Sequence, residues 1–224
     1  MFRRLPGAPA ITHRELVEGW VERLSALGLP LPQAEGTRAR SPLSFAAPLP
    51  VGMAAERELA DLLLSERLPM PDVRDRLVPT LPEAVELVSL HDVWLGVAPL
   101  AASLAGADYR VRLNGELAPS DLERAARDLL KAESVPRQRM RGTTLVSYDL
   151  RPLVATIVID PFGRGGPDPE GIELLIRTLF DPARGAGRPE EVVAELAGRS
   201  NRPIDIEDIV RERVFLSDEL DMLQ

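Results

Sequence analysis

Apolar residues recur with a helical period near the start of the chain. Four of them follow one another at spacings of four, four and three residues: Leu16, Trp20, Leu24 and Leu27. Such a pattern places all four on one face of a helix that packs on a core. Thr12 stands where a helix N-cap is expected, and Gly28 stands where the helix would end.

The rest of the first half alternates between strand and helix patterns. A short strand is predicted within 43–49, and a short helix begins at Pro71 and ends before Pro79. A further strand is predicted over 83–95. Residues 56–66 fit both states, because their Leu, Ala and Glu content favours a helix while their apolar positions also alternate.

The pattern begins again after a segment of small, uncharged residues over 99–106. Apolar residues at Tyr109, Val111 and Leu113 alternate with arginines, which predicts a strand. Ser120 forms an S-x-x-E capping box with Glu123 in front of an amphipathic helix. Pro189 begins a second helix, and strands are predicted over 137–141, 144–148, 153–160, 172–180 and 204–216.

Both halves therefore follow the order strand, helix, strand, strand, helix, strand. This order predicts an α+β protein of two ferredoxin-like (βαββαβ) halves with antiparallel sheets, an N-terminal half over 1–100 and a C-terminal half over 107–224. The first strand of the N-terminal half is degenerate, because Pro6, Gly7 and Pro9 interrupt it. We expect a truncated edge strand there.

The amino-acid composition excludes several kinds of catalytic and metal-binding site. The 224-residue chain has no cysteine, which excludes thiolate zinc sites, iron–sulfur clusters and thiol nucleophiles, so any redox or radical chemistry has to come from a partner. No metal-ligand spacing or phosphate-binding glycine loop occurs, and we predict no metal and no cofactor. There is no apolar run of membrane length and no signal peptide, so we expect a cytoplasmic protein away from the membrane.

Charge argues against nucleic-acid binding by the surface as a whole, since the net charge is −8. Basic residues nevertheless gather locally, at two sites: Arg38 with Arg40, and Arg137 with Arg139 and Arg141. Alternation over 137–141 places three guanidinium groups on one face of a strand, which suits a phosphate backbone or an acidic partner. The same pattern also fits a solvated edge strand that charge protects against aggregation.

His13 is the candidate for acid–base chemistry. It lies at the predicted helix start beside Thr12 and Glu15, where an imidazole suits a general base or a contact to an anion. Packing against the helix N-terminus is the alternative role. Because one histidine without a partner base supplies only part of a hydrolytic mechanism, we expect no catalytic activity from the chain alone.

Several motifs resemble those of a known family. The chain has Thr12-His13-Arg14-Glu15 and Leu27-Gly28-Leu29-Pro30 where that family has S-H-L-D and A-G-L-P. Residues 36–52 read G-T-R-A-R-S-P-L-S-F-A-A-P-L-P-V-G, similar to the family's G-F-N-P-R-P-R-I-S-F-A-P-A-L-P-V-G, and 133–152 is similar to a later region. The chain thus resembles a domain of unknown function that is fused to, or encoded beside, radical SAM enzymes, often near ribonuclease E/G genes.

The resemblance implies a strand over 58–64 and an accessory or substrate-recognition module that works with a radical SAM enzyme in RNA modification. In that hypothesis the binding residues for RNA or another anion are His13, Arg38, Arg40, Arg137, Arg139 and Arg141. Arg38, Ala39 and Glu15 depart from the family pattern. Two alternatives stay open: a metal-independent RNA-processing enzyme that uses His13, and a structural assembly module.

Overall fold

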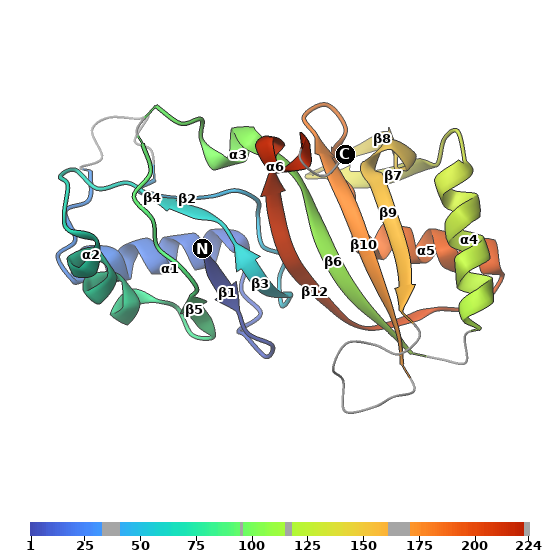
Figure 1. Cartoon of the computed structure of the whole chain (residues 1–224), viewed down its shortest axis with the longest axis horizontal. Helices are drawn as coiled ribbons and strands as arrows, with labels where there is room; N and C mark the ends of the chain where they lie inside the picture. The colour runs from blue at the N-terminus through green and yellow to red at the C-terminus, as the bar shows by residue number, and fades with distance from the viewer. Residues whose placement is uncertain (33–40, 95, 115–117, 161–170, 222–224) are drawn as a thin grey trace. The chain divides into compact units, whose positions relative to one another are not determined.

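The computed structural model describes residues 1–32, 41–94, 96–114, 118–160 and 171–221 (Figure 1). The chain forms two compact units: the first is Met1–Leu104 with the segment from Leu216 onward, and the second is Ala105–Phe215. The predicted halves were 1–100 and 107–224. Helices and antiparallel strand pairs occur in both units, so the chain is an α+β protein.

The first unit is built around a short strand. Strand β1 lies between β3 and β5 and is antiparallel to both, while β2 and β4 form a separate antiparallel pair. The described elements are β1 (Phe2–Arg4), α1 (His13–Ala26), β2 (Leu43–Phe45), β3 (Ala54–Glu58), β4 (Ala60–Leu62), α2 (Met70–Leu77), η1 (Val78–Thr80), β5 (Val85–Leu87), α3 (Leu100–Ser103) and α6 (Ser217–Asp221).

The first strand is short, as predicted, but the prediction that it lies at a sheet edge is wrong. Its three residues pair with β5, Phe2 and Arg4 also pair with β3, and Phe2 is buried against the rings of Trp20 and Phe45. Burial of one large aromatic side chain and hydrogen bonding along both edges compensate for the length that Pro6 removes. The strand predicted over 83–95 shrinks to Val85–Leu87.

Helix α1 follows the sequence pattern closely. Thr12 caps the helix by accepting from the Glu15 amide, and the Glu15 carboxylate accepts from the Thr12 amide at 2.7 Å. Gly28 ends the helix region with φ of +69°, a conformation that favours glycine. On the buried face, Trp20 Nε1 donates to Thr80 Oγ1 at 3.2 Å, which fixes α1 against η1.

The second unit contains a larger antiparallel sheet. Its strands run in the order β11-β10-β6-β12, and β9 also pairs with β10. Helices α4 and α5 pack against each other, and α5 lies behind the strands in Figure 1. The described elements are β6 (Leu104–Asn114), α4 (Pro119–Lys131), β7 (Pro136–Arg141), β8 (Thr144–Asp149), η2 (Arg151–Leu153), β9 (Val154–Asp160), β10 (Ile172–Asp181), β11 (Gly185–Ala186), α5 (Pro189–Ser200) and β12 (Asp205–Leu216).

The two units share one feature of strand order. In each unit the first strand lies between a middle strand and the last strand: β3-β1-β5 in the first and β10-β6-β12 in the second. The first strand is antiparallel to its middle-strand neighbour in both cases. Each unit therefore organises its sheet around the strand that begins it.

Helix α4 begins differently from the prediction. Ala118 is the N-cap and makes no side-chain hydrogen bond, so the predicted capping box of Ser120 and Glu123 is wrong. Pro119 explains the shift, because its fixed φ favours the first helical position and moves Ser120 inside the helix. The predicted apolar face is confirmed, with its residues buried: Leu122, Ala125, Ala126 and Leu129.

Candidate functional site

His13 is placed by the N-terminus of α1 and by the segment after β2. Its ring meets the Phe45 ring edge-on, with centroids 4.9 Å apart, and its Nδ1 accepts from the Leu49 amide at 3.4 Å. These contacts tie the start of α1 to the neighbouring segment. That His13 contacts a phosphate or acts on a base stays a prediction.

The predicted arginine loop cannot be placed beside His13, since Arg38 and Arg40 lie outside the described residues. The side chain of Arg141 also lies outside the described part of the structure. Of the five arginines predicted to contact nucleic acid, the structure therefore describes the side chains of Arg137 and Arg139.

Arg137 and Arg139 lie on β7 of the β7–β8 hairpin, and both donate to groups outside the hairpin. Arg137 Nη2 donates to Glu195 of α5 at 2.7 Å. Arg139 donates to the backbone carbonyls of Arg184 and Ala186 at 2.9 and 3.2 Å. The two arginines thus fasten the hairpin to α5 and β11.

Tyr148 completes this hairpin cluster. The Arg139 guanidinium stacks over its ring, 4.4 Å from the centroid, a favourable cation–π geometry. Burial, followed by the nearby Glu191 carboxylate, raises the pKa of the Tyr148 phenol to about 12. The phenol is therefore protonated at neutral pH, which suits a structural role better than that of a base.

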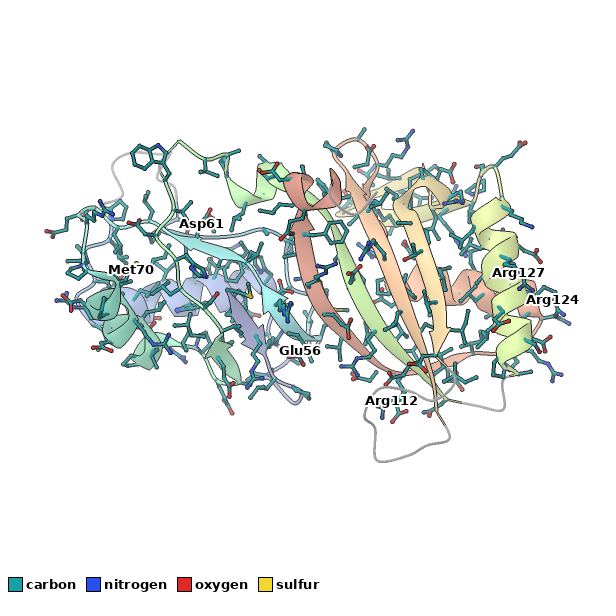
Figure 2. All side chains as sticks on the ribbon, in the orientation of Figure 1. Glu56, Asp61, Met70, Arg112, Arg124 and Arg127 are labelled. Carbon is teal, nitrogen blue, oxygen red and sulfur yellow. The ribbon has the colours of Figure 1, made fainter. Side chains whose placement is uncertain are left out.

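A second group of arginines lies on the sheet of the same unit. It includes Arg110 and Arg112 on β6, which alternate with buried apolar residues of that strand. Arg177 on β10 and Arg213 on β12 both pair with Asp108, which alternates with the same buried residues of β6. We call this group the arginine face; Figure 2 shows one of its members, Arg112, at an end of β6.

Asp108 organises one end of the arginine face. It lies directly opposite Arg177 in the β6–β10 register and accepts from Arg177 Nε at 2.7 Å and Nη2 at 3.0 Å. Arg213 Nε donates to the same carboxylate at 2.9 Å. Burial by itself raises the pKa of Asp108, but the hydrogen bonds from the two arginines outweigh it and hold that pKa below its usual range.

Glu173 organises the other end. Its side chain is only 1% exposed and accepts from Arg112 Nη2 at 3.1 Å, with Arg110 Nη1 3.7 Å away. Arg110 also donates through Nε to Glu212 at 3.2 Å. A carboxylate this deeply buried requires paired cations, so the arginines here are structural partners as well as surface charges.

A close approach of strands supports the Asp108 end. The Phe215 ring lies over Gly106, where an added β-carbon would come within 2.6 Å of the ring and 2.3 Å of the Thr178 carbonyl oxygen. Arg177 and Arg213 lie 5.3 and 5.9 Å from the Phe215 ring centroid. Glycine at position 106 therefore allows an aromatic platform under both guanidinium groups.

The arginine face is a network of ion pairs between neighbouring strands. Among the described contacts, each of its arginines uses one or two of its three nitrogens for a carboxylate, and the other N–H groups are of the type that also binds anions. Asp108 is ionised but engaged by two arginines, so it is a poor base. No cluster of three or more metal-ligating side chains occurs within the described ranges, and no helix in them is long and apolar enough to span a membrane.

Sequence reasoning missed this face for a physical reason. The alternation of Arg110 and Arg112 with apolar residues was visible in the sequence, but the partner carboxylates lie about 60 to 100 residues away. The signal that was available was the placement of charged residues inside otherwise apolar strands, at Glu173 and Arg177. Buried-strand charges of this kind require partners on neighbouring strands.

Comparison with solved structures gives a fold-level likeness. The chain is similar to one described as "Crystal Structure of a Cbf5-Nop10-Gar1 Complex", with a TM-score of 0.52 and 11% identity over 97% of this chain and 50% of that one. A second, "Crystal structure of the archaeal box H/ACA sRNP Nop10-Cbf5 complex", has a TM-score of 0.46 and 13% identity over 97% and 49%. The chain thus spans about half the length of these neighbours.

Sequence comparisons give a family. No curated protein matches the chain. One family model matches residues 1–182, which is most of the 224-residue sequence. The chain therefore belongs to the bacterial family described as "Uncharacterized protein conserved in bacteria (DUF2344)".

Proposed function

We propose that the chain is a non-catalytic accessory or substrate-recognition module that works in the cytoplasm with a radical SAM enzyme in RNA modification. In this proposal the arginine face of the second unit contacts the RNA backbone. The observation that carries the proposal is the gathering of four guanidinium groups, Arg110, Arg112, Arg177 and Arg213, on one sheet of a chain whose net charge is −8.

The donors on the face suit an anion as the ligand. Among the described contacts, the four arginines pair with the carboxylates of Asp108, Glu173 and Glu212. Arginine suits this task because its planar fork binds phosphate oxygens while one side remains paired. The surrounding acidic surface would repel the same polyanion elsewhere and direct it to this face.

We also propose that both units are ferredoxin-like halves. Without its β7–β8 hairpin, the second unit follows the order β6-α4-β9-β10-α5-β12, and β9-β10-β6-β12 is its strand order. The split βαβ arrangement has this element order, and a four-stranded sheet with one open face is a known platform for RNA. The likeness to a Cbf5-containing complex is an analogy of fold alone.

The proposal of a radical SAM enzyme as the partner rests on the sequence resemblance over residues 12–15, 27–30 and 36–52. A chain without cysteine has no thiolates for an iron–sulfur cluster, so the radical chemistry belongs to the partner in this proposal. A purely structural assembly module is the alternative if no RNA is bound. The alternative of an RNA-processing enzyme that uses His13 stays a prediction; the ring packs on Phe45 and accepts from the Leu49 amide.

The test is fluorescence anisotropy of a labelled single-stranded RNA at about 50 and 200 mM salt. The Arg110→Gln, Arg213→Gln double variant removes two charges yet leaves Glu173 with Arg112 and Asp108 with Arg177. If both arginines contact phosphates, the salt slope decreases by about 1.4, since each contact on a single strand contributes about 0.7.

The matched control is the Arg14→Gln, Arg67→Gln variant. It changes the net charge by the same amount at two well-exposed side chains of the first unit, and we expect wild-type binding from it. An equal loss from both variants would contradict the assignment to the arginine face. Absence of binding by the wild type at the lower salt would remove the RNA proposal and leave the assembly module.

A further inference from the structure

Strand β9 has an edge that no described strand covers. Among the described strands it pairs with β10 alone. Its other edge meets α4 across a groove of about 290 Å³, and the groove is lined by Glu123, Ala126, Arg127, Leu130, Ile157, Val158 and Ile159. Three consecutive residues of β9 therefore line this groove.

The β9 edge lacks the features that usually prevent an edge strand from pairing with a strand of another chain. Residues 154–160 read V-A-T-I-V-I-D, without proline or lysine and with Asp160 as the one charge. Val158 is 52% exposed at the middle of the strand. An apolar, β-branched edge with open N–H and C=O groups is a template for another strand.

The charged residues beside the β9 edge indicate what kind of partner could bind there. Glu123 and Arg127 lie four residues apart on α4, and Figure 2 shows Arg127 on that helix. Within the described part of the chain neither residue forms an ion pair. A groove that offers one acid and one base, a helical turn apart, is complementary to itself after rotation by 180°.

We propose that β9 pairs antiparallel with β9 of a second copy of this chain, to form a two-fold symmetric dimer with a continuous sheet. With the two-fold axis near Val158, Ile157 of each copy lies opposite Ile159 of the other. The two α4 helices then run antiparallel side by side, and Glu123 of each copy faces Arg127 of the other. The dimer requires no RNA and no enzyme partner, so it is independent of the proposed function.

The test is the oligomeric state of the full chain by sedimentation velocity over a concentration series. The wild type is expected to dimerise. Glu123→Arg and Arg127→Glu each place like charges across the two-fold axis, and each should weaken the dimer at least about tenfold, equal to about 1.4 kcal/mol. An equimolar mixture of the two single variants restores opposite charges at both contacts, so heterodimers should form in the mixture alone.

A second variant tests the strand directly. Val158→Arg introduces a charge at an exposed position of the edge, and should give a monomer with an unchanged circular dichroism spectrum. Leu145→Arg is the control, because Leu145 is 57% exposed on β8 and should leave the dimer intact. A monomeric wild type at about 100 μM, a dimeric Val158→Arg, or a mixture that fails to form heterodimers would overturn the proposal.

Discussion

The β7–β8 hairpin and the arginine face carry the same sequence pattern with different outcomes. On β7 and on β6, arginines occupy alternate positions: Arg137 with Arg139, and Arg110 with Arg112. The hairpin pair reaches α5 and the backbone of β11, and Arg139 stacks on a tyrosine. The β6 pair meets carboxylates of neighbouring strands on the sheet itself.

The difference shows that arginines at alternate positions of a strand predict only that their side chains lie on the same face of that strand. The groups opposite that face decide what an arginine contacts: Glu195 and backbone carbonyls for the hairpin pair, and carboxylates of neighbouring strands for the β6 pair. Arg139 donates to two backbone carbonyls and stacks on a tyrosine ring, whereas Arg213 donates through Nε to the Asp108 carboxylate and lies over the Phe215 ring. The predictions below test this contrast.

Gly106→Ala should have the largest effect, on stability. The new β-carbon would lie 2.3 Å from the Thr178 carbonyl oxygen, a backbone atom of the sheet, and overpacking of this kind costs about 3 kcal/mol. Urea unfolding followed by far-UV circular dichroism measures it. Gly198→Ala is the control: nothing lies near its β-carbon position in α5, so it should be neutral or stabilising. Equal stability of the two variants would contradict the close strand approach.

Asp108→Asn should destabilise the protein by about 2 kcal/mol at pH 7, less than a fully buried ion pair because the side chain is 19% exposed. The same change removes the anion that two arginines share, so RNA affinity should rise. Opposite signs in urea unfolding and RNA anisotropy are the expected result. A loss of RNA affinity in a folded variant would contradict the anion-binding role of the face.

The pH dependence of this variant has a definite sign. The folded-state pKa of Asp108 is lowered by Arg177 and Arg213, so its contribution to stability is present above its unfolded pKa of about 3.9. That contribution is lost as the pH falls from there through the folded pKa. The stability gap between wild type and Asp108→Asn should therefore be constant from pH 7 to 5 and shrink below about pH 4.

Arg137→Gln should reduce stability by about 1 kcal/mol, because a half-buried ion pair with Glu195 is lost. Glu195 keeps Arg199 as a partner, which limits the loss. RNA affinity should stay within about twofold of the wild type, in contrast to the Arg110→Gln, Arg213→Gln variant. If Arg137→Gln lowered RNA affinity more than that double variant does, the RNA-binding site would lie on the hairpin and not on the arginine face.

Arg14→Gln should have the smallest effect. Its ion pair with Glu18 lies on the exposed surface of α1, where such pairs are weak. Neither the urea midpoint nor RNA binding should change measurably. This variant sets the baseline for the preceding three.

Local patterns predicted most of the elements. The helix that begins at His13 and the strands of the second unit follow from periodicity and from caps. The sequence could not show that β1 is central, because strand order depends on pairings with Glu58 and Leu87, more than fifty residues away. It also could not show the arginine face, because Arg112 and Arg110 on β6 meet carboxylates from β10 and β12, and Asp108 on β6 meets arginines from the same two strands.

The central claim is that the sheet, and not the hairpin, presents arginines to RNA. The most direct measurement is an NMR titration of the arginine Nε–Hε signals with single-stranded RNA, because it reports both regions in one sample. The account predicts that the signals of Arg110, Arg112 and Arg213 shift with RNA while those of Arg137 and Arg139 stay in place. Shifts confined to Arg137 and Arg139 would contradict it.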